Sequence, residues 1–318
     1  MKTIIKYLRD FVRADFNPVV YGLFFLFLAV TIFINYYFKF EQNILTPLNF
    51  KPGIFFYNFL FFIFPYFAVA AIKFSIEKKY HYFKNSEFWV KSLLFMFLIG
   101  FAQGFYQYRE LIPEKITQEE FVFTARLFVN IKRFIIFLIP IFIIKLIYDR
   151  QSGTGLYGIH FHKFNVKPYF LILLFVIPLI VWASFQPDFL RTYPTLKPWY
   201  ANGSYGLTYF QAYGIYEFFY GMDFMMVEFM FRGALIIGMM KILGKDALLP
   251  MVAAYAFLHF GKPAAETISS VFGGYVLGVI AFRTKSIWGG CILHIGLAFA
   301  MEAAALMQYY NMGKIEGL

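Results

Sequence analysis

Nine apolar runs decide the class of this protein more than any other feature. A transmembrane helix needs about 20 predominantly apolar residues, and a backbone in lipid must pair all its polar groups internally, as a helix does. We therefore predict an all-α polytopic membrane protein with eight or nine transmembrane helices, since two runs are short. The runs span residues 19–39, 54–74, 89–108, 131–148, 168–186, 211–240, 247–260, 267–283 and 287–309.

The composition excludes several other classes of protein. Of the 318 residues, 60% are apolar and only 15% are charged, whereas about a quarter of a soluble domain is charged. The single cysteine, Cys291, excludes a disulfide framework and a thiolate metal site. The net charge is +11, but the basic residues are scattered between apolar runs rather than clustered on one polar face. We therefore expect membrane lipids, and no nucleic acid, as partners.

The distribution of Lys and Arg predicts the orientation. With the N-terminus in the cytoplasm, 17 basic residues fall on the cytoplasmic side and 11 on the other, and Arg232 lies inside a run. This bias favours a cytoplasmic N-terminus. Residues 1–17 have the pattern of a basic amphipathic helix, with Ile4, Leu8, Phe11 and Val12 on one face. We expect such a helix to lie on an anionic membrane surface.

The chain shows one shift in composition, a segment rich in Pro, Gly and Tyr before the sixth run. Such a segment is typical of an extended loop. We therefore divide the chain into a surface helix at 1–18, N-terminal transmembrane helices at 19–187, an external loop at 188–210, a core that carries the chemistry at 211–309 and a tail at 310–318.

Ionisable residues are concentrated inside the C-terminal runs. A charged side chain at mid-bilayer costs roughly 2.5–3.5 kcal/mol on insertion scales, so each such residue needs a reason. The residues are Glu217, Asp223, Glu228, Arg232, His259, His294 and Glu302.

Three of these residues are predicted at similar depths. Glu228 and His259 each lie 12 residues from the short turn between their runs, counted from Met240 and Ala247, which is about 18 Å of helix. His294 lies about 14 Å into the last run. Three helices can thus place a carboxylate and two imidazoles in one buried pocket, which is what activation of a water molecule requires.

Each candidate also has a purely structural interpretation. Glu228 and Arg232 are four residues apart and can neutralise each other on one helix face, and a single histidine is more often a satisfied core residue than a catalyst. Asp223 lies nearer the outer end of its run, where it can meet water. Glu302, two turns beyond His294, either pairs with the site or reaches outward.

Other polar and small residues carry weaker signals. Gly274 and Gly278 have the spacing of a helix-packing face. His160 and His162 form a weak metal signal that is more typical of a solvated turn. HExxH, Walker, GxSxG and dinucleotide-binding motifs are absent. We predict no cofactor, while zinc held by two histidines and a carboxylate stays an open alternative.

Three short motifs resemble those of a known family. Val227-Glu228 with Arg232 is similar to EExxxR, Tyr255 with His259 to FxxxH, and His294 with Ala298 to a histidine followed four residues later by asparagine. In this order and on these runs, they resemble the CPBP intramembrane proteases. That family includes the type II CAAX prenyl endopeptidases and bacterial relatives linked to bacteriocin maturation and self-immunity. The resemblance covers roughly residues 211–300.

The resemblance implies a cavity in the cell (inner) membrane of a bacterium that is open to the cytoplasm. In the family, a glutamate and the histidine of the second motif activate water, and the histidine and asparagine of the third motif hold the oxyanion. Peptide bonds near a lipid-modified or membrane-embedded C-terminus are cut without a required metal. Carried over, Glu228 and His259 activate water, His294 stabilises the oxyanion and Arg232 orients Glu228.

This sequence departs from the family pattern at three positions. The first glutamate of the first motif is Val227, the asparagine is Ala298 and the phenylalanine is Tyr255. A helix turns about 100° per residue, so Glu228 does not replace a carboxylate at 227 by a small rotation. Asp223, one turn from Val227 on the same face, is a candidate for a relocated carboxylate.

Three functions follow from this pattern. The first is an intramembrane endopeptidase that acts on a peptide or a membrane-protein substrate. The second is a pseudoprotease that keeps the polar pocket and binds a peptide, lipid or partner protein without cutting it. The third is a transporter that uses the buried acids as proton relays, although the inverted repeats expected of many transporters are not evident.

Overall fold

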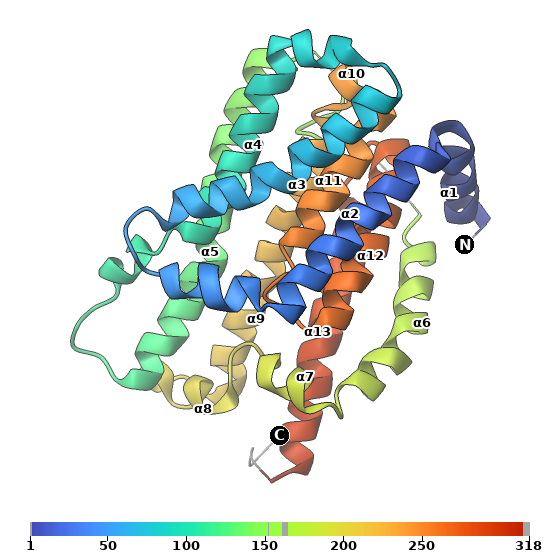
Figure 1. The fold of residues 1–318 in the computed structure, drawn as a ribbon. Helices are drawn as coiled ribbons and strands as arrows, with labels where there is room; N and C mark the ends of the chain where they lie inside the picture. Colours follow the sequence, from blue (N-terminus) through green and yellow to red (C-terminus); the bar gives the residue numbers. More distant parts are fainter. Residues whose placement is uncertain (1, 152, 161–164, 314–318) are drawn as a thin grey trace. The chain divides into compact units, whose positions relative to one another are not determined.

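A computed structural model describes residues 2–151, 153–160 and 165–313. The described backbone is helical apart from turns and a single isolated bridge between Leu156 and Ile159, which confirms the predicted all-α class (Figure 1). The longer helices are α1 (Lys2–Asp15), α2 (Pro18–Tyr37), α3 (Ile54–Ile76), α4 (Ser86–Gly104), α5 (Gln118–Tyr148), α6 (Lys167–Ala183), α9 (Tyr209–Glu228), α11 (Leu248–Phe257), α12 (Ala264–Thr284) and α13 (Trp288–Asn311).

Short helical turns join the longer helices. They are η1 (Glu41–Leu45), η2 (Thr46–Leu48), η3 (Tyr80–Lys84), η4 (Gln107–Leu111), α7 (Pro187–Thr192), α8 (Pro198–Ala201), η5 (Ser204–Gly206), α10 (Met240–Leu243) and η7 (Gly244–Ala247). One further segment, η6 (Phe229–Ile237), is a π-helix that continues α9. The predicted external loop at 188–210 therefore contains α7, α8 and η5 rather than extended chain.

The helices agree with a polytopic membrane protein. In the described residues, six helices are long and apolar enough to cross a membrane: α2, α3, α4, α5, α12 and α13. The remaining predicted runs contain α6, the continuous pair α9 and η6, and α11. The α11 helix has 10 residues, or about 15 Å, which is roughly half of a bilayer core. The structure is consistent with the predicted eight to nine transmembrane helices.

The chain forms two compact units, which we describe separately. Unit 1 comprises residues 1–105, 139–163 and 228–290, and unit 2 comprises residues 106–138, 164–227 and 291–318.

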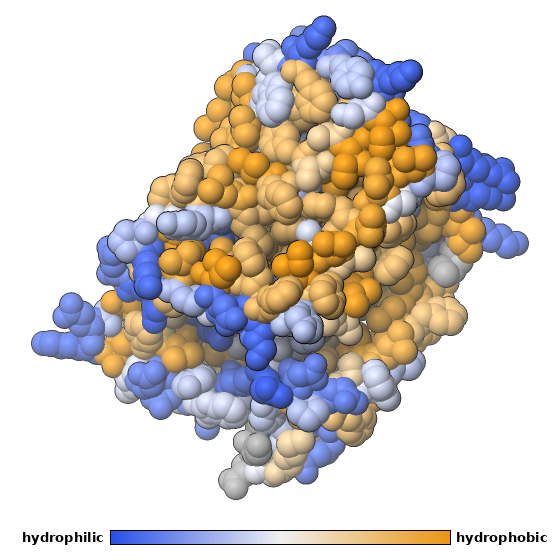
Figure 2. All heavy atoms as spheres, in the orientation of Figure 1, coloured by the Kyte–Doolittle hydropathy of each residue, from blue (hydrophilic) through white to orange (hydrophobic). Residues whose placement is uncertain are grey.

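Close helix packing holds unit 1 together. Gly100 and Gly104 of α4 lie directly against the backbone of α3, where an added Cβ would come within 2.6 Å of Phe59 and Phe55 backbone atoms. Gly278 of α12 likewise faces Leu248 on α11, so the predicted packing role of this glycine is observed. Figure 2 shows apolar side chains covering the outward faces of α2, α3 and α4, as expected for helices that face lipid.

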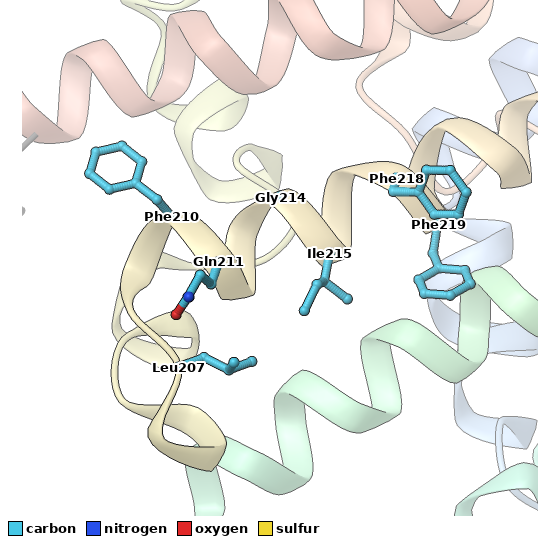
Figure 3. Close-up of a pocket in the computed structure, with 7 residues that line it drawn as sticks. All are labelled: Leu207, Phe210, Gln211, Gly214, Ile215, Phe218 and Phe219. Atoms are coloured by element: carbon cyan, nitrogen blue, oxygen red, sulfur yellow. The ribbon is translucent and has the colours of Figure 1, made fainter.

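Tyrosines line the core of unit 2. Tyr213, Tyr216 and Tyr220 on α9 are buried in one cluster with Leu196 and Ala298. On another face of α9, an open groove of about 530 Å³ is lined almost entirely by apolar side chains (Figure 3). Its lining is Leu207, Phe210, Gln211, Gly214, Ile215, Phe218 and Phe219.

The first helix packs on α12 in unit 1. Ile4 and Phe11 are buried, and the Phe11 ring meets the edges of Tyr275 and Phe282. Of the apolar face predicted from the sequence, Ile4 and Phe11 are therefore covered by protein, whereas Leu8 is partly buried and Val12 is 37% exposed. The basic side chains of α1 remain exposed beside Ile5, and the location of α1 on an anionic membrane surface stays a prediction.

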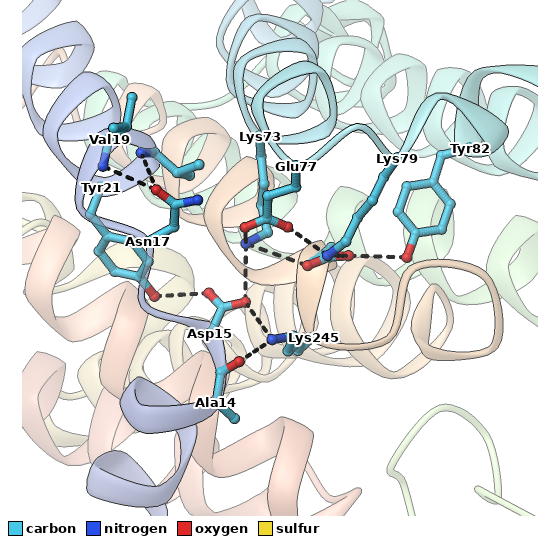
Figure 4. A network of polar contacts seen from close by, with 12 residues as sticks. Ala14, Asp15, Asn17, Val19, Tyr21, Lys73, Glu77, Lys79, Tyr82 and Lys245 are labelled. Carbon is cyan, nitrogen blue, oxygen red and sulfur yellow. Dashed lines mark hydrogen bonds and ion pairs between the residues drawn. The ribbon is translucent and has the colours of Figure 1, made fainter.

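A buried polar network fixes the end of α1 in unit 1 (Figure 4). The fully buried Lys73 ammonium lies 3.0 Å from Asp15, 3.1 Å from Glu77 and 3.4 Å from Asp246. The Tyr82 hydroxyl donates to Asp246 at 3.0 Å. Burial and this carboxylate raise the pKa of Tyr82 to about 12. The network thus joins α1, α3 and η7 through one lysine.

Candidate active site

The first-motif residues lie where the helix changes register in unit 1. Glu228 is the last residue of α9, and Arg232 lies inside η6. The Gly238 amide donates to the Gly233 carbonyl at 2.8 Å, which is the five-residue bond of a π-helix. Such segments are frequent at functional sites, so this change of register marks the region as a candidate site.

Glu228 and Arg232 form a fully buried ion pair. Glu228 Oε1 lies 3.0 Å from Arg232 Nη1, and both side chains have no exposed surface. Glu228 Oε2 lies against Gly290 in the first turn of α13, so closely that an added Cβ would collide with it. The positive end of the α13 dipole and the guanidinium therefore both stabilise this carboxylate.

Tyr255 links this pair to the second motif. The Arg232 guanidinium lies 4.2 Å from the centre of the Tyr255 ring, within cation–π range. Phe231 meets the same ring edge-on. Gly274 of α12 makes room for it, since a Cβ there would lie 2.9 Å from the ring. Tyr255 is thus a central part of the site, although from the sequence it registered only as a departure from the family phenylalanine.

His259 lies one turn further on, just beyond the end of α11. Its ring centre is 4.7 Å from that of Tyr255, and its Nδ1 lies 2.9 Å from the Tyr255 carbonyl oxygen. A carbonyl can only accept, so Nδ1 carries the hydrogen. In the neutral imidazole, Nε2 then holds the lone pair. His259 is partly exposed, so its ring combines a fixed tautomer with access from outside.

Two neighbouring helices hold the turn that carries His259. Thr267 of α12 donates to the His259 carbonyl at 2.5 Å. Tyr36 of α2 lies 2.6 Å from the same threonine hydroxyl and donates to the Lys262 carbonyl at 2.7 Å. Asn35 donates to the Phe260 carbonyl at 3.0 Å. Asn35 and Tyr36 carry no recognisable spacing in the sequence, since they lie more than 220 positions before the carbonyls that they bind.

Unit 2 holds the other predicted candidates. Asp223 is buried, and its Oδ2 lies 2.5 Å from Nη1 of Arg133 on α5. The His294 ring lies 4.5 Å from that of Phe224. Ala298 is buried in the tyrosine cluster, where its methyl group offers no hydrogen bond. The predicted convergence of Glu228 and His259 with His294 joins residues of both units and stays a prediction.

Glu302 has a structural partner set within unit 2. It accepts hydrogen bonds from the Thr195 amide at 2.8 Å, the Thr195 hydroxyl at 2.6 Å and the Tyr213 hydroxyl at 2.7 Å. Glu302 is therefore buried and pairs with the segment between α7 and α8, and its pairing with the predicted site stays a prediction.

The weak metal signal receives a local explanation. His160 Nε2 lies 3.0 Å from the Lys285 carbonyl oxygen, and His162 lies outside the described residues. Across the parts of the chain that the structure describes, no group of three His, Cys, Asp or Glu side chains is placed to hold a metal ion.

Comparison with known proteins finds a similarity in this region. Residues 218–300 match the Rce1-like family model, described as type II CAAX prenyl endopeptidase Rce1-like. The predicted resemblance to the CAAX/CPBP proteases is confirmed. No curated protein and no solved structure gives a significant match.

The Rce1-like segment contains Glu228, Arg232, Tyr255, His259 and His294. Both halves of the buried ion pair and both motif histidines therefore fall within the matched region, and α1 to α6 lie outside it.

Proposed function

We propose that this protein is an intramembrane endopeptidase of the CAAX type, which hydrolyses a peptide bond of a membrane-associated or lipid-modified substrate. The arrangement that carries the proposal is the partly exposed His259 ring, fixed by the Tyr255 carbonyl and joined through Tyr255 to the buried Glu228–Arg232 pair. The N-terminus lies in the cytoplasm in this proposal, as the distribution of basic residues favours.

In this proposal, His259 and Glu228, the two candidates for a base, have different roles. His259 Nε2 is the acceptor for the proton of the attacking water, because Nδ1 is committed to a carbonyl. The Glu228 carboxylate is bound by Arg232 on one oxygen and packed on Gly290 at the other. It acts mainly as a positioning residue that fixes Arg232 under Tyr255. His294 keeps the oxyanion role that the family resemblance implies.

A second candidate function is a pseudoprotease that binds a peptide or membrane partner without cutting it. Specific observations favour it: Val227, in place of the first family glutamate, is buried and has no ionisable group. Asp223, the candidate replacement, is held by Arg133. A protein that lost its base and kept the rest of the pocket would show this combination.

One experiment separates the two functions. The protein, purified in nanodiscs, is incubated with farnesylated and unmodified C-terminal peptides, and products and retained peptides are measured by mass spectrometry. Wild type is compared with His259→Ala and with His81→Ala, which removes an exposed histidine from η3.

For an endopeptidase, His259→Ala should lose cleavage by at least about 100-fold, the usual contribution of a general base, and His81→Ala should retain it. Equal product from wild type and His259→Ala would refute the endopeptidase proposal. Peptide retained by the wild type with no product would support the pseudoprotease instead.

A further inference from the structure

Residues of α4 and of the loop between α5 and α6 form a buried cluster beside η6 within unit 1. We propose that Lys91, Asp149 and Tyr157 form a positioning device that holds η6 in its π-helical register and thereby aims Glu228 and Arg232. The part of this inference that concerns catalysis rests on the proposed function, whereas the part that concerns register does not.

Lys91 binds the end of the π-helix. Its ammonium is fully buried and donates to the Gly238 carbonyl, the residue that follows η6, at 3.2 Å. The same nitrogen lies 2.5 Å from Asp149 Oδ2 and 2.7 Å from Glu87 Oε1. Carbonyls at the end of a helix lack intrahelical partners and carry its negative pole, so a lysine at this point stabilises that end.

Tyr157 packs directly on the π-helix. It is buried, and its hydroxyl donates to Asp149 Oδ2 at 2.5 Å. Burial and this hydrogen bond raise the pKa of Tyr157, so the hydroxyl stays a donor. Its carbonyl oxygen lies 2.9 Å from where a Cβ of Gly233 would be, and its ring 3.1 Å from where one of Gly238 would be. Two glycines of the helix thus fit against one tyrosine.

These contacts bear on register because a π-helix accommodates one residue more than an α-helix in the same turn. If η6 returned to α-helical bonding, the end of α9 that carries Glu228 would rotate by about 100° relative to the chain that follows Gly238. Arg232 would then leave the Tyr255 ring. Tyr157 contacts Gly233 in the middle of the segment, and both Tyr157 and Lys91 contact Gly238 just beyond its end, so the two residues oppose that rotation.

The test uses Tyr255 as a reporter. The protein is prepared with 3-fluorotyrosine at position 255, and its ¹⁹F spectrum reports the guanidinium over the ring. Tyr157→Phe is compared with Tyr82→Phe, because each removes one hydroxyl that donates to a carboxylate in unit 1. Should Tyr157→Phe fail to fold, Asp149→Asn replaces it.

The expected result is a shifted or split Tyr255 resonance in Tyr157→Phe and an unchanged one in Tyr82→Phe. In the peptide assay, Tyr157→Phe should lower kcat at least about tenfold with little change in KM, because a misaimed site loses rate rather than binding. An unchanged resonance in the folded Tyr157 or Asp149 variant would overturn the inference. A wild type that cuts no peptide would refute the proposed function alone, since the spectrum still reports register.

Discussion

Removing both partners of the Glu228–Arg232 pair should destabilise the protein by much less than the sum of the two single removals. The two side chains lie 3.0 Å apart between nitrogen and oxygen, and neither has exposed surface. The single variants Glu228→Gln and Arg232→Met each leave one charge buried without its partner. The double variant leaves no charge, so the loss in free energy of unfolding should be much smaller than the sum.

The magnitude follows from the burial. With charge centres about 4 Å apart and an effective dielectric constant near 20, the attraction is about 4 kcal/mol. Breaking a buried pair by removing one partner costs about 3–5 kcal/mol. Arg232→Met also loses the contact with Tyr255, which is worth about 2 kcal/mol when desolvated. That loss is common to the single and the double variant, so it cancels from the coupling. We expect a coupling energy of at least about 2 kcal/mol.

The assay is reversible unfolding in mixed micelles, followed by circular dichroism, over a double-mutant cycle. The chain offers a matched control in Lys262 and Glu266, an i,i+4 pair 4.0 Å apart whose side chains are 37% and 24% exposed. Its coupling should be about 0.5 kcal/mol or less. A coupling for Glu228 and Arg232 no larger than that of the control pair would refute the reasoning, because it would mean that the two charges do not depend on each other.

Three further outcomes follow from the contacts. Gly290→Ala should displace the Glu228 carboxylate and reduce the cleavage rate by about 10- to 100-fold. The control is Gly273→Ala, whose added methyl group meets open space and should leave the rate unchanged. Equal cleavage rates for the two variants would contradict this prediction. Asp223→Asn should change cleavage by no more than about threefold, because Arg133 holds this carboxylate, and a complete loss would make it the base. The raised pKa of Tyr82, about 12 against an ordinary 10.0, means that its stabilisation is complete below about pH 10 and is lost as pH rises through 12. Between about pH 10 and 12, the melting temperature of Tyr82→Phe should fall less than that of the wild type. Parallel curves of melting temperature against pH for the two proteins would count against this contact.

The sequence predicted the helices well because lipid leaves few alternatives. Each apolar run contains a helix, and the ends of the run at 54–74 agree with α3 (Ile54–Ile76) within two residues. The all-α class needed no tertiary information, since the solvent itself imposes internal backbone pairing. The short helices within 188–210 were not predicted, and the bond between Thr195 of this segment and Glu302 joins residues 107 positions apart.

The motif residues were found because their chemistry is costly in lipid. Charges and imidazoles inside apolar runs pointed to Glu228, Arg232 and His259, and the i,i+4 spacing predicted the observed ion pair. The role of Gly290 could not be predicted, because no sequence pattern indicates that a glycine packs against a carboxylate. The π-helix at η6 was equally hidden, because it depends on a tyrosine 76 residues before Gly233.

The buried pair alone does not decide between cutting and binding. Two charges inside a membrane cost several kcal/mol, and their retention needs a cause. The structure meets that cost with a helix N-terminus at Gly290 and the ring of Tyr255, and both candidate functions would keep this arrangement. His259 differs from the pair, because it joins an ordered tautomer to partial exposure. A binder needs neither feature, whereas a hydrolase needs both. The His259 variant is therefore the one whose activity distinguishes the two functions.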